Sequence, residues 1–167
     1  KTAYEIKQCD WSSDVCSSDL VAIVGDVLHS RVARSLVQAL RLVGAHVTLV
    51  GPPPLLPEGL GVERSYDIRD ITSADIVYVL RMQRERMEEG ANYVPSLREY
   101  TARWGVTLDR LTASQRVMHP GPMNRGVEID PRVADSPQAL VVDQVKAGLV
   151  VRMAVLYLML GGTEMNA

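Results

Sequence analysis

Short apolar runs alternate with helical patterns along most of the chain. Mainly apolar runs occupy residues 21–25 (VAIVG), 46–50 (HVTLV) and 75–80 (DIVYVL), and residues 115–118 (QRVM) begin a further predicted strand. Runs of this kind predict strands that are buried on both faces of a parallel sheet. A short apolar stretch containing Val141 and Val142 predicts one more strand.

The segments between these runs have the spacing of helices. After Ser30, a residue suited to cap a helix, apolar residues recur at helical spacing until Gly44. Residues 68–74 predict a short helical element, and residues 94–104 predict a helix with Pro95 in its first turn. Strands that alternate with helices predict an α/β fold, in which helices flank a doubly wound parallel sheet.

The last predicted helix, residues 144–160, is apolar nearly all round after Gly148. A helix of this kind needs burial on more than one side. It is too short for a membrane span and is interrupted by Arg152, so no membrane role is expected. We therefore expect residues 148–167 to pack on a part of the protein that lies outside this chain.

The first 20 residues differ in character from the rest. They are polar, hold both cysteines (Cys9 and Cys16) and lack the apolar core of a signal peptide. The strings KTAYEI and DWSSDVCSSDL resemble translations of sequencing-adapter DNA, so residues 1–20 are interpreted as a non-native, disordered leader. A disordered native N-terminus is the alternative, and the two cysteines indicate a metal or redox site only weakly. Residues 21–147 are then expected to form one domain.

The charge of the chain favours neither nucleic acid nor an anionic membrane as a partner. Its 18 basic and 20 acidic residues give a net charge of −2. Residues 1–20 hold two of the basic and four of the acidic residues, so 16 of each remain and the rest of the chain is neutral. That part also has no cysteine, which is consistent with a cytoplasmic protein that needs no disulfide.

Two arginines follow strands whose carboxyl ends share one edge of the predicted sheet, where ligands of such folds bind. Arg31 begins a helix, and the free N–H groups there favour an anion. Arg81 and Gln83 lie two positions apart, so in extended backbone they face the same side. Two guanidinium groups in one crevice suit a ligand with two carboxylates. The alternative is a pair of ordinary surface arginines.

The sequence HPGPMNRG, residues 119–126, follows the last of the long strands. Prolines on both sides of Gly121 make the backbone rigid and leave carbonyl groups without partners in a strand ladder. The carbonyls of Gly121 and Pro122 could therefore accept hydrogen bonds from an amide-bearing substrate, although a structural turn explains the same pattern. His119 is expected to be packed or on the surface rather than catalytic. No histidine has metal-ligand spacing, and neither a dinucleotide nor a P-loop motif occurs.

Four segments together resemble the second domain of bacterial aspartate carbamoyltransferases: VAIVGDVLHSRVARS, VYVLRMQRERM, VPSLREY and HPGPMNRGVEI. The likeness runs in order from residue 21 to about residue 160, and HPGPMNRGVEI is its most specific part. Residues 57–70 look shorter than the corresponding segment of the family, so a helix there is expected to be trimmed.

The resemblance implies roles for five residues. Arg31 and Arg81 would bind the α- and β-carboxylates of L-aspartate, and Gln83 would position its amino group. Gly121 and Pro122 would offer main-chain carbonyls to the carbamoyl NH₂ of carbamoyl phosphate. The implied reaction gives N-carbamoyl-L-aspartate and phosphate, a step of pyrimidine synthesis. No metal or organic cofactor is expected, because positioning and charge stabilisation carry such a reaction.

The resemblance also implies a missing half. In this family a phosphate-binding loop, a polarising histidine and a mobile lysine loop belong to an N-terminal domain, which also makes most of the contacts of a catalytic homotrimer. We therefore expect no catalytic residue in this chain and no activity from the chain alone. The alternatives are a non-catalytic scaffold member of the family and an ornithine carbamoyltransferase, in which Arg81 would face a like charge.

Overall fold

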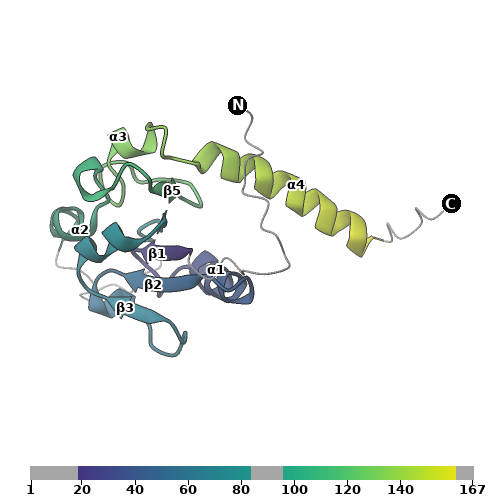
Figure 1. Ribbon diagram of the computed structural model, residues 1–167, viewed down its shortest axis with the longest axis horizontal. Coiled ribbons are helices and arrows are strands. Elements are labelled where there is room, and N and C mark those ends of the chain that lie inside the picture. The colour runs from purple at the N-terminus through teal and green to yellow at the C-terminus, as the bar shows by residue number, and fades with distance from the viewer. Residues whose placement is uncertain (1–18, 84–95, 161–167) are drawn as a thin grey trace.

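The computed structural model describes residues 19–83 and 96–160 (Figure 1). Five parallel strands form one sheet in the order β3-β2-β1-β4-β5. The strands are β1 (Leu20–Val24), β2 (His46–Val50), β3 (Glu63–Ser65), β4 (Ile76–Val79) and β5 (Arg116–Met118). The chain builds one half of the sheet outward from β1 and then returns to build the other half, so the predicted doubly wound fold is confirmed.

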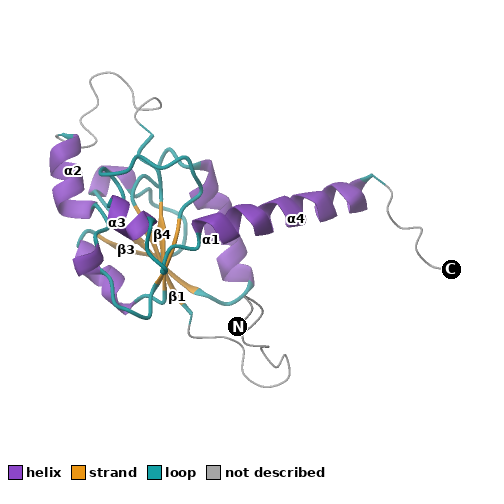
Figure 2. Ribbon diagram, turned by 90° about the horizontal axis from the view of Figure 1, so that it is seen from above, coloured by secondary structure: helices purple, strands orange, loops and turns teal. Residues whose placement is uncertain are grey.

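Helices cover both faces of this sheet, with α1 on one side of the strands and α3 on the other (Figure 2). The α-helices are α1 (Arg31–Leu42), α2 (Leu97–Trp104), α3 (Pro131–Ala134) and α4 (Val141–Met159). Three short 3₁₀ helices complete the described elements: η1 (Pro53–Leu55), η2 (Ile68–Ser73) and η4 (Leu108–Arg110).

Alternate residues of the central strand enter two different cores. Ile23 packs on one face of the sheet with Ala33 and Val37 of α1. Val24 points to the opposite face and packs with Ile71 of η2. All five side chains are buried. Because both faces of the sheet are covered, β1 is an apolar run rather than an alternation of apolar and polar residues.

The ends of α1 are set by its sequence. The Ser30 hydroxyl accepts a hydrogen bond from the Ala33 N–H over 3.1 Å, which confirms the predicted cap. At the other end Gly44 has φ +79°, a conformation that glycine adopts without steric cost. The predicted helix at 94–104 is observed from Leu97, with Ser96 as its cap, and the expected first turn at Pro95 lies outside the described residues.

The sheet differs from the sequence-based expectation in one strand boundary and in one additional strand. Leu20, which was assigned to the leader, pairs with His46 as the first residue of β1, and its N–H donates to Asp75 over 2.9 Å. The sheet therefore includes the last residue of that segment. The edge strand β3 was not predicted, because the sequence Glu-Arg-Ser has no apolar signal. An edge strand needs burial on fewer sides, so polar residues are tolerated there.

The predicted strand at Val141 and Val142 is wrong, because both residues belong to the first turn of α4. The chain does run beside β5, but it does so just earlier, where Ala139 forms a parallel bridge with Val117. The Leu140 carbonyl already accepts from the Gln144 N–H, which commits the backbone to the helix. The apolar signal came from the helix and not from the strand.

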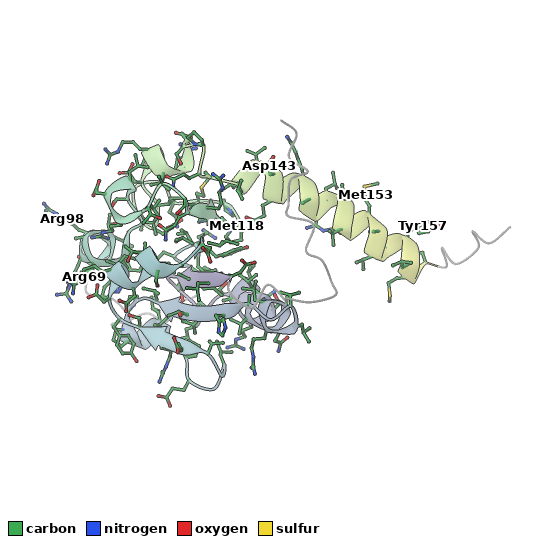
Figure 3. The ribbon with its side chains drawn as sticks, viewed as in Figure 1. Arg69, Arg98, Met118, Asp143, Met153 and Tyr157 are labelled. Atoms are coloured by element: carbon green, nitrogen blue, oxygen red, sulfur yellow. The ribbon has the colours of Figure 1, made fainter. Side chains whose placement is uncertain are left out.

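Most of α4 projects away from the sheet (Figure 1). Its first turn is anchored by Gln144, whose side chain donates to the Tyr78 hydroxyl over 2.9 Å and accepts from the His119 N–H over 3.2 Å. Beyond that turn every residue from 145 to 160 is exposed. Figure 3 shows Met153 and Tyr157 on this outer part, with no other helix or strand beside them. Within the described residues, no helix combines the length and apolar character that crossing a membrane requires.

Candidate functional site

Three loops lie together at the carboxyl edge of the sheet, after β1, β4 and β5. Strand β4 is the neighbour of both β1 and β5, so the three loops start side by side. The backbone N–H of Gln83 donates to Oδ2 of Asp26 over 3.3 Å, which ties the loop after β4 to the loop after β1. The Asn124 side-chain amide donates to the Met82 carbonyl over 3.2 Å, which ties the loop after β4 to the loop after β5. These bonds join the three segments that carry the predicted ligand residues.

Asp26 organises the first of these loops. Its carboxylate is fully buried, and Oδ1 accepts from the His29 backbone N–H over 3.1 Å. The same oxygen lies 2.8 Å from Nδ1 of His29. An ionised carboxylate only accepts hydrogen bonds, so Nδ1 of His29 carries a proton in this contact. The loop that leads to α1 is thereby held in one conformation.

Gly25 allows the close packing behind this loop. Its φ is +116°, and a Cβ atom there would lie 2.9 Å from the Tyr100 hydroxyl and 3.2 Å from the Leu80 carbonyl oxygen. Only glycine fits both the conformation and the space. Tyr100 itself is fully buried, and burial raises the pKa of its hydroxyl, with Glu128 and Asp26 raising it further. The hydroxyl is therefore neutral at physiological pH.

The structure brings the predicted aspartate-binding residues to this edge. Arg31 is the first residue of α1 and its side chain is exposed, at the end of the helix where the dipole favours anions. Arg81 follows Leu80, whose N–H still pairs with the Val24 carbonyl, and its side chain is half-buried. Gln83 is half-buried as well.

The two residues whose carbonyls are predicted to accept hydrogen bonds lie on the third loop. Gly121 and Pro122 are exposed, the peptide bond between them is cis, and Gly121 has φ +65°. The Gly121 N–H donates to Nδ1 of His119 over 2.9 Å. His119 is fully buried, so of the two positions left open by the sequence, packed or on the surface, the packed one is observed.

Three side chains that build the site were not among the residues predicted from the sequence. Asp26, Asn124 and Glu128 all hold loops in place, and two of them, Asp26 and Glu128, are fully buried. Asp26 could have been noticed, because it directly follows the apolar run VAIVG at the carboxyl end of a strand. Glu128 follows an exposed turn, and its burial has no signature in the sequence.

The carboxyl edge combines the two kinds of group that the sequence pattern predicted. Guanidinium groups from two loops can bind carboxylates, and rigid backbone carbonyls from the third loop can accept hydrogen bonds from an N–H group. Among the described residues, no set of three His, Cys, Asp or Glu side chains is placed to hold a metal ion. A cavity of about 940 Å³ lies at the other edge of the sheet, beside Leu20 and His46, and none of the predicted residues lines it.

Residues 19–159 match the sequence model of the aspartate/ornithine carbamoyltransferase family, Asp/Orn-binding domain. The chain belongs to this family. The match covers all elements from β1 to α4, so the fold and the order of the loops are those of the Asp/Orn-binding domain.

Individual relatives agree with this assignment. The aspartate carbamoyltransferase catalytic subunit of Salinispora arenicola is 55% identical over 154 residues, which cover 86% of this chain and 49% of that protein. The structure of aspartate transcarbamoylase from Trypanosoma cruzi with N-(phosphonacetyl)-L-aspartic acid aligns with a TM-score of 0.69 and 25% identity, over 84% of this chain and 49% of that one. Ornithine carbamoyltransferase from Pyrococcus furiosus aligns with a TM-score of 0.70 and 27% identity, over 87% and 50%. The chain thus spans about half the length of the curated relatives that it matches.

Proposed function

We propose that this chain is the aspartate-binding half of an aspartate carbamoyltransferase, which transfers the carbamoyl group of carbamoyl phosphate to L-aspartate in pyrimidine synthesis. The observation that carries the proposal is the pair of hydrogen bonds, Gln83 to Asp26 and Asn124 to Met82, that joins the three ligand-bearing loops. The relative from Salinispora arenicola, at 55% identity, has the corresponding name. The Trypanosoma cruzi enzyme binds a compound that joins an aspartate to a phosphonacetyl group.

In the proposed site, Arg31 and Arg81 bind the two carboxylates of L-aspartate and Gln83 positions its amino group. The exposed Arg31 adds the favourable potential of the α1 N-terminus to its own charge. Gly121 and Pro122 accept hydrogen bonds from the carbamoyl NH₂. Five groups on three tied loops would hold both substrates at a fixed relative orientation, which lowers the entropic part of the barrier.

The proposed reaction is an acyl transfer. The uncharged amino nitrogen of aspartate attacks the carbamoyl carbon, and a new C–N bond forms. The bond from that carbon to the phosphate oxygen breaks, the nitrogen loses a proton, and phosphate leaves with the electron pair. In the tetrahedral intermediate, negative charge develops on the former carbonyl oxygen, and its stabilisation falls to groups outside this chain.

The remaining half of the enzyme would bind the phosphate and cover α4. The exposed apolar surface of α4, beyond its anchored first turn, supports the proposal that residues 148–167 pack on a carbamoyl-phosphate domain. We propose that the full-length protein forms a homotrimer. We also propose that it is located in the cytoplasm, since residues 21–167 have no cysteine and need no disulfide. Within the predicted leader of residues 1–20, residues 1–18 are likewise proposed to be non-native, whereas Leu20 belongs to β1.

Turnover measurements on two proteins test this function. The full-length protein that contains this chain is expected to convert carbamoyl phosphate and L-aspartate to N-carbamoyl-L-aspartate, while the 167-residue chain alone is expected to produce none. Product is measured by mass spectrometry so that non-enzymatic carbamoylation can be subtracted. Turnover by the purified chain would show that the catalytic groups lie within it.

Two alternatives have their own outcomes in the same assay. An ornithine carbamoyltransferase would form citrulline from ornithine and leave aspartate unused, but the second carboxylate-binding arginine disfavours the amine of ornithine. A scaffold member of the family would bind aspartate without turnover, and its N-terminal half would lack the phosphate-binding loop.

A further inference from the structure

Two fully buried ionisable side chains, His119 and Glu128, stand at the two ends of the exposed turn that contains Gly121 and Pro122. The proposed function uses the carbonyls of that turn and gives neither buried side chain a role. Burying such groups is unfavourable unless they meet polar partners, so their contacts are informative. One polar atom of each side chain accepts a hydrogen bond from the backbone of the turn, whereas Nε2 of His119 and Oε2 of Glu128 are buried without one.

His119 binds the first arm of the turn. Nδ1 accepts a hydrogen bond from the Gly121 N–H over 2.9 Å. A ring nitrogen that accepts cannot carry a proton, so the imidazole is neutral and its hydrogen is on Nε2. The backbone of His119 is fixed as well, because its N–H donates to the Gln144 side chain at the start of α4.

Glu128 binds the second arm. Its Oε1 accepts from the Asn124 N–H over 2.5 Å and lies 3.4 Å from Nε2 of His119. The 3.4 Å distance is longer than an ordinary N–H···O hydrogen bond of about 2.7–3.2 Å, so this contact is an electrostatic attraction between the ring N–H and the carboxylate. The Asn124 amide in turn donates to the Met82 carbonyl, beside Arg81 and Gln83.

We propose that His119 and Glu128 are positioning residues, which together hold the Gly121 backbone so that its carbonyl meets the carbamoyl NH₂. This inference rests on the proposed function and adds to it. The bond at Nδ1 fixes the plane of the Pro120–Gly121 peptide, and the bond at Asn124 fixes the chain after Pro122. The proton on Nε2 keeps the ring facing Glu128, and with it the acceptor facing Gly121. A rigid acceptor orients carbamoyl phosphate, while aspartate is bound by other groups.

Two substitutions of His119 distinguish the role of its Nδ1 from the role of its Nε2. In His119→Asn the side-chain oxygen takes approximately the place of Nδ1 and can still accept from Gly121. In His119→Gln the amide nitrogen takes approximately the place of Nε2 and can still donate to Glu128, but the acceptor for Gly121 is lost. Both variants are made in the full-length protein. Val47→Ala is the control, because it destabilises a buried position of β2, which β1 and β4 separate from β5 and its loop.

The steady-state constants for each substrate give the main readout. His119→Gln is expected to lose about 100-fold in kcat/KM for carbamoyl phosphate, the effect expected from misplacing a substrate by about 1 Å. His119→Asn should retain activity within about tenfold of the wild type, since the Gly121 bond survives. KM for aspartate should change little in either His119 variant, and Val47→Ala should lower the unfolding temperature without changing either KM.

Inhibitor binding distinguishes a moved turn from an unfolded site. N-(phosphonacetyl)-L-aspartate has no carbamoyl NH₂, so His119→Gln should change its Kd by less than about threefold while carbamoyl phosphate use falls. Equal activity of His119→Gln and the wild type would overturn the positioning role, and so would an equal loss in His119→Gln and His119→Asn. A wild-type enzyme that makes no N-carbamoyl-L-aspartate would instead refute the proposed function.

Discussion

The backbone N–H of Gln83 donates a hydrogen bond to the buried carboxylate of Asp26, a residue 57 positions earlier in the chain. Asp26 also accepts from His29, two residues before Arg31. One carboxylate thus fixes the position of the loop after β4 relative to the start of α1. The proposed aspartate site depends on this link, since its two arginines come from these two segments.

Replacing Asp26 by Asn should weaken aspartate use. One amide oxygen cannot replace both carboxylate oxygens, and the amide N–H₂ would face an N–H donor of either His29 or Gln83. Hydrogen bonds to charged groups contribute about 1.5–3 kcal/mol, so KM for aspartate is expected to rise by about tenfold or more. Steady-state kinetics of the full-length protein measure this. Asp109→Asn, at an exposed carboxylate in η4, is the control, and unchanged kinetics in Asp26→Asn would contradict the link.

Arg81→Ala should impair the use of aspartate more severely than Asp26→Asn does, and it should leave the binding of carbamoyl phosphate nearly unchanged. The unpaired β-carboxylate of the bound aspartate would cost about 2–5 kcal/mol, which corresponds to a loss of roughly 30-fold or more in kcat/KM for aspartate. The Kd for carbamoyl phosphate, measured by calorimetry, should hardly change. Arg116→Ala removes an exposed arginine from β5 and provides the matched control. Equal damage to both substrates would assign Arg81 a different role.

The exposed surface of α4 predicts self-association of the isolated chain. Val150 and Leu156 are 65% and 53% exposed, on a helix with an apolar outer part. Contiguous apolar surface of this kind tends to associate. Sedimentation velocity of the 167-residue chain should show association that rises with concentration, and the double substitution Val150→Lys and Leu156→Lys should reduce it without changing the unfolding temperature.

The same double substitution should act differently in the full-length protein. There we propose that α4 is buried, so two lysines would be desolvated and the unfolding temperature should fall. Gln38→Lys, at an exposed position of α1, controls for added charge in both proteins. A wild-type chain that stays monomeric at all concentrations would argue against an uncovered apolar surface.

An exposed ion pair predicts a small acid-dependent change in stability. Asp67 caps η2 and binds the Arg69 guanidinium, and this hydrogen bonding lowers the pKa of Asp67 from 3.8 to about 2. Because the folded-state pKa is lowered, the stabilisation is complete above about pH 4 and is lost as the pH falls toward 2. Asp67→Asn should therefore be less stable than the wild type at pH 7 and equally stable near pH 2.

Chemical unfolding of both proteins across this pH range measures the difference. The effect at pH 7 should also decrease with added salt, since the pair is solvent-exposed. A difference in stability that stays constant from pH 7 to pH 2 would show that the charge of Asp67 contributes nothing and that only its capping geometry matters.

The elements of the fold were predictable where burial leaves a periodic pattern. The central strand, the helix after Ser30 and the strand at 46–50 are apolar because they are covered on both faces, and each lies within one residue of its predicted position. The pattern failed at β3, a polar edge strand, and at Val141 and Val142, where an apolar pair belongs to a helix. Local hydrophobicity therefore does not identify the element, and at Val142, which is 66% exposed, it does not coincide with burial either.

The amino-acid sequence alone predicted most of the strands and helices and the residue types suited to a dicarboxylate, because these depend on local pattern and on recognisable segments. The contact of Asp26 with Gln83, the contact of Asn124 with Met82, and the burial of His119 and Glu128 beneath an exposed turn became visible in the three-dimensional fold. These contacts join residues that are up to 57 positions apart. They exist because parallel pairing brings the carboxyl ends of β1, β4 and β5 to one edge of the sheet. No periodicity in the sequence predicts which residues come into contact there.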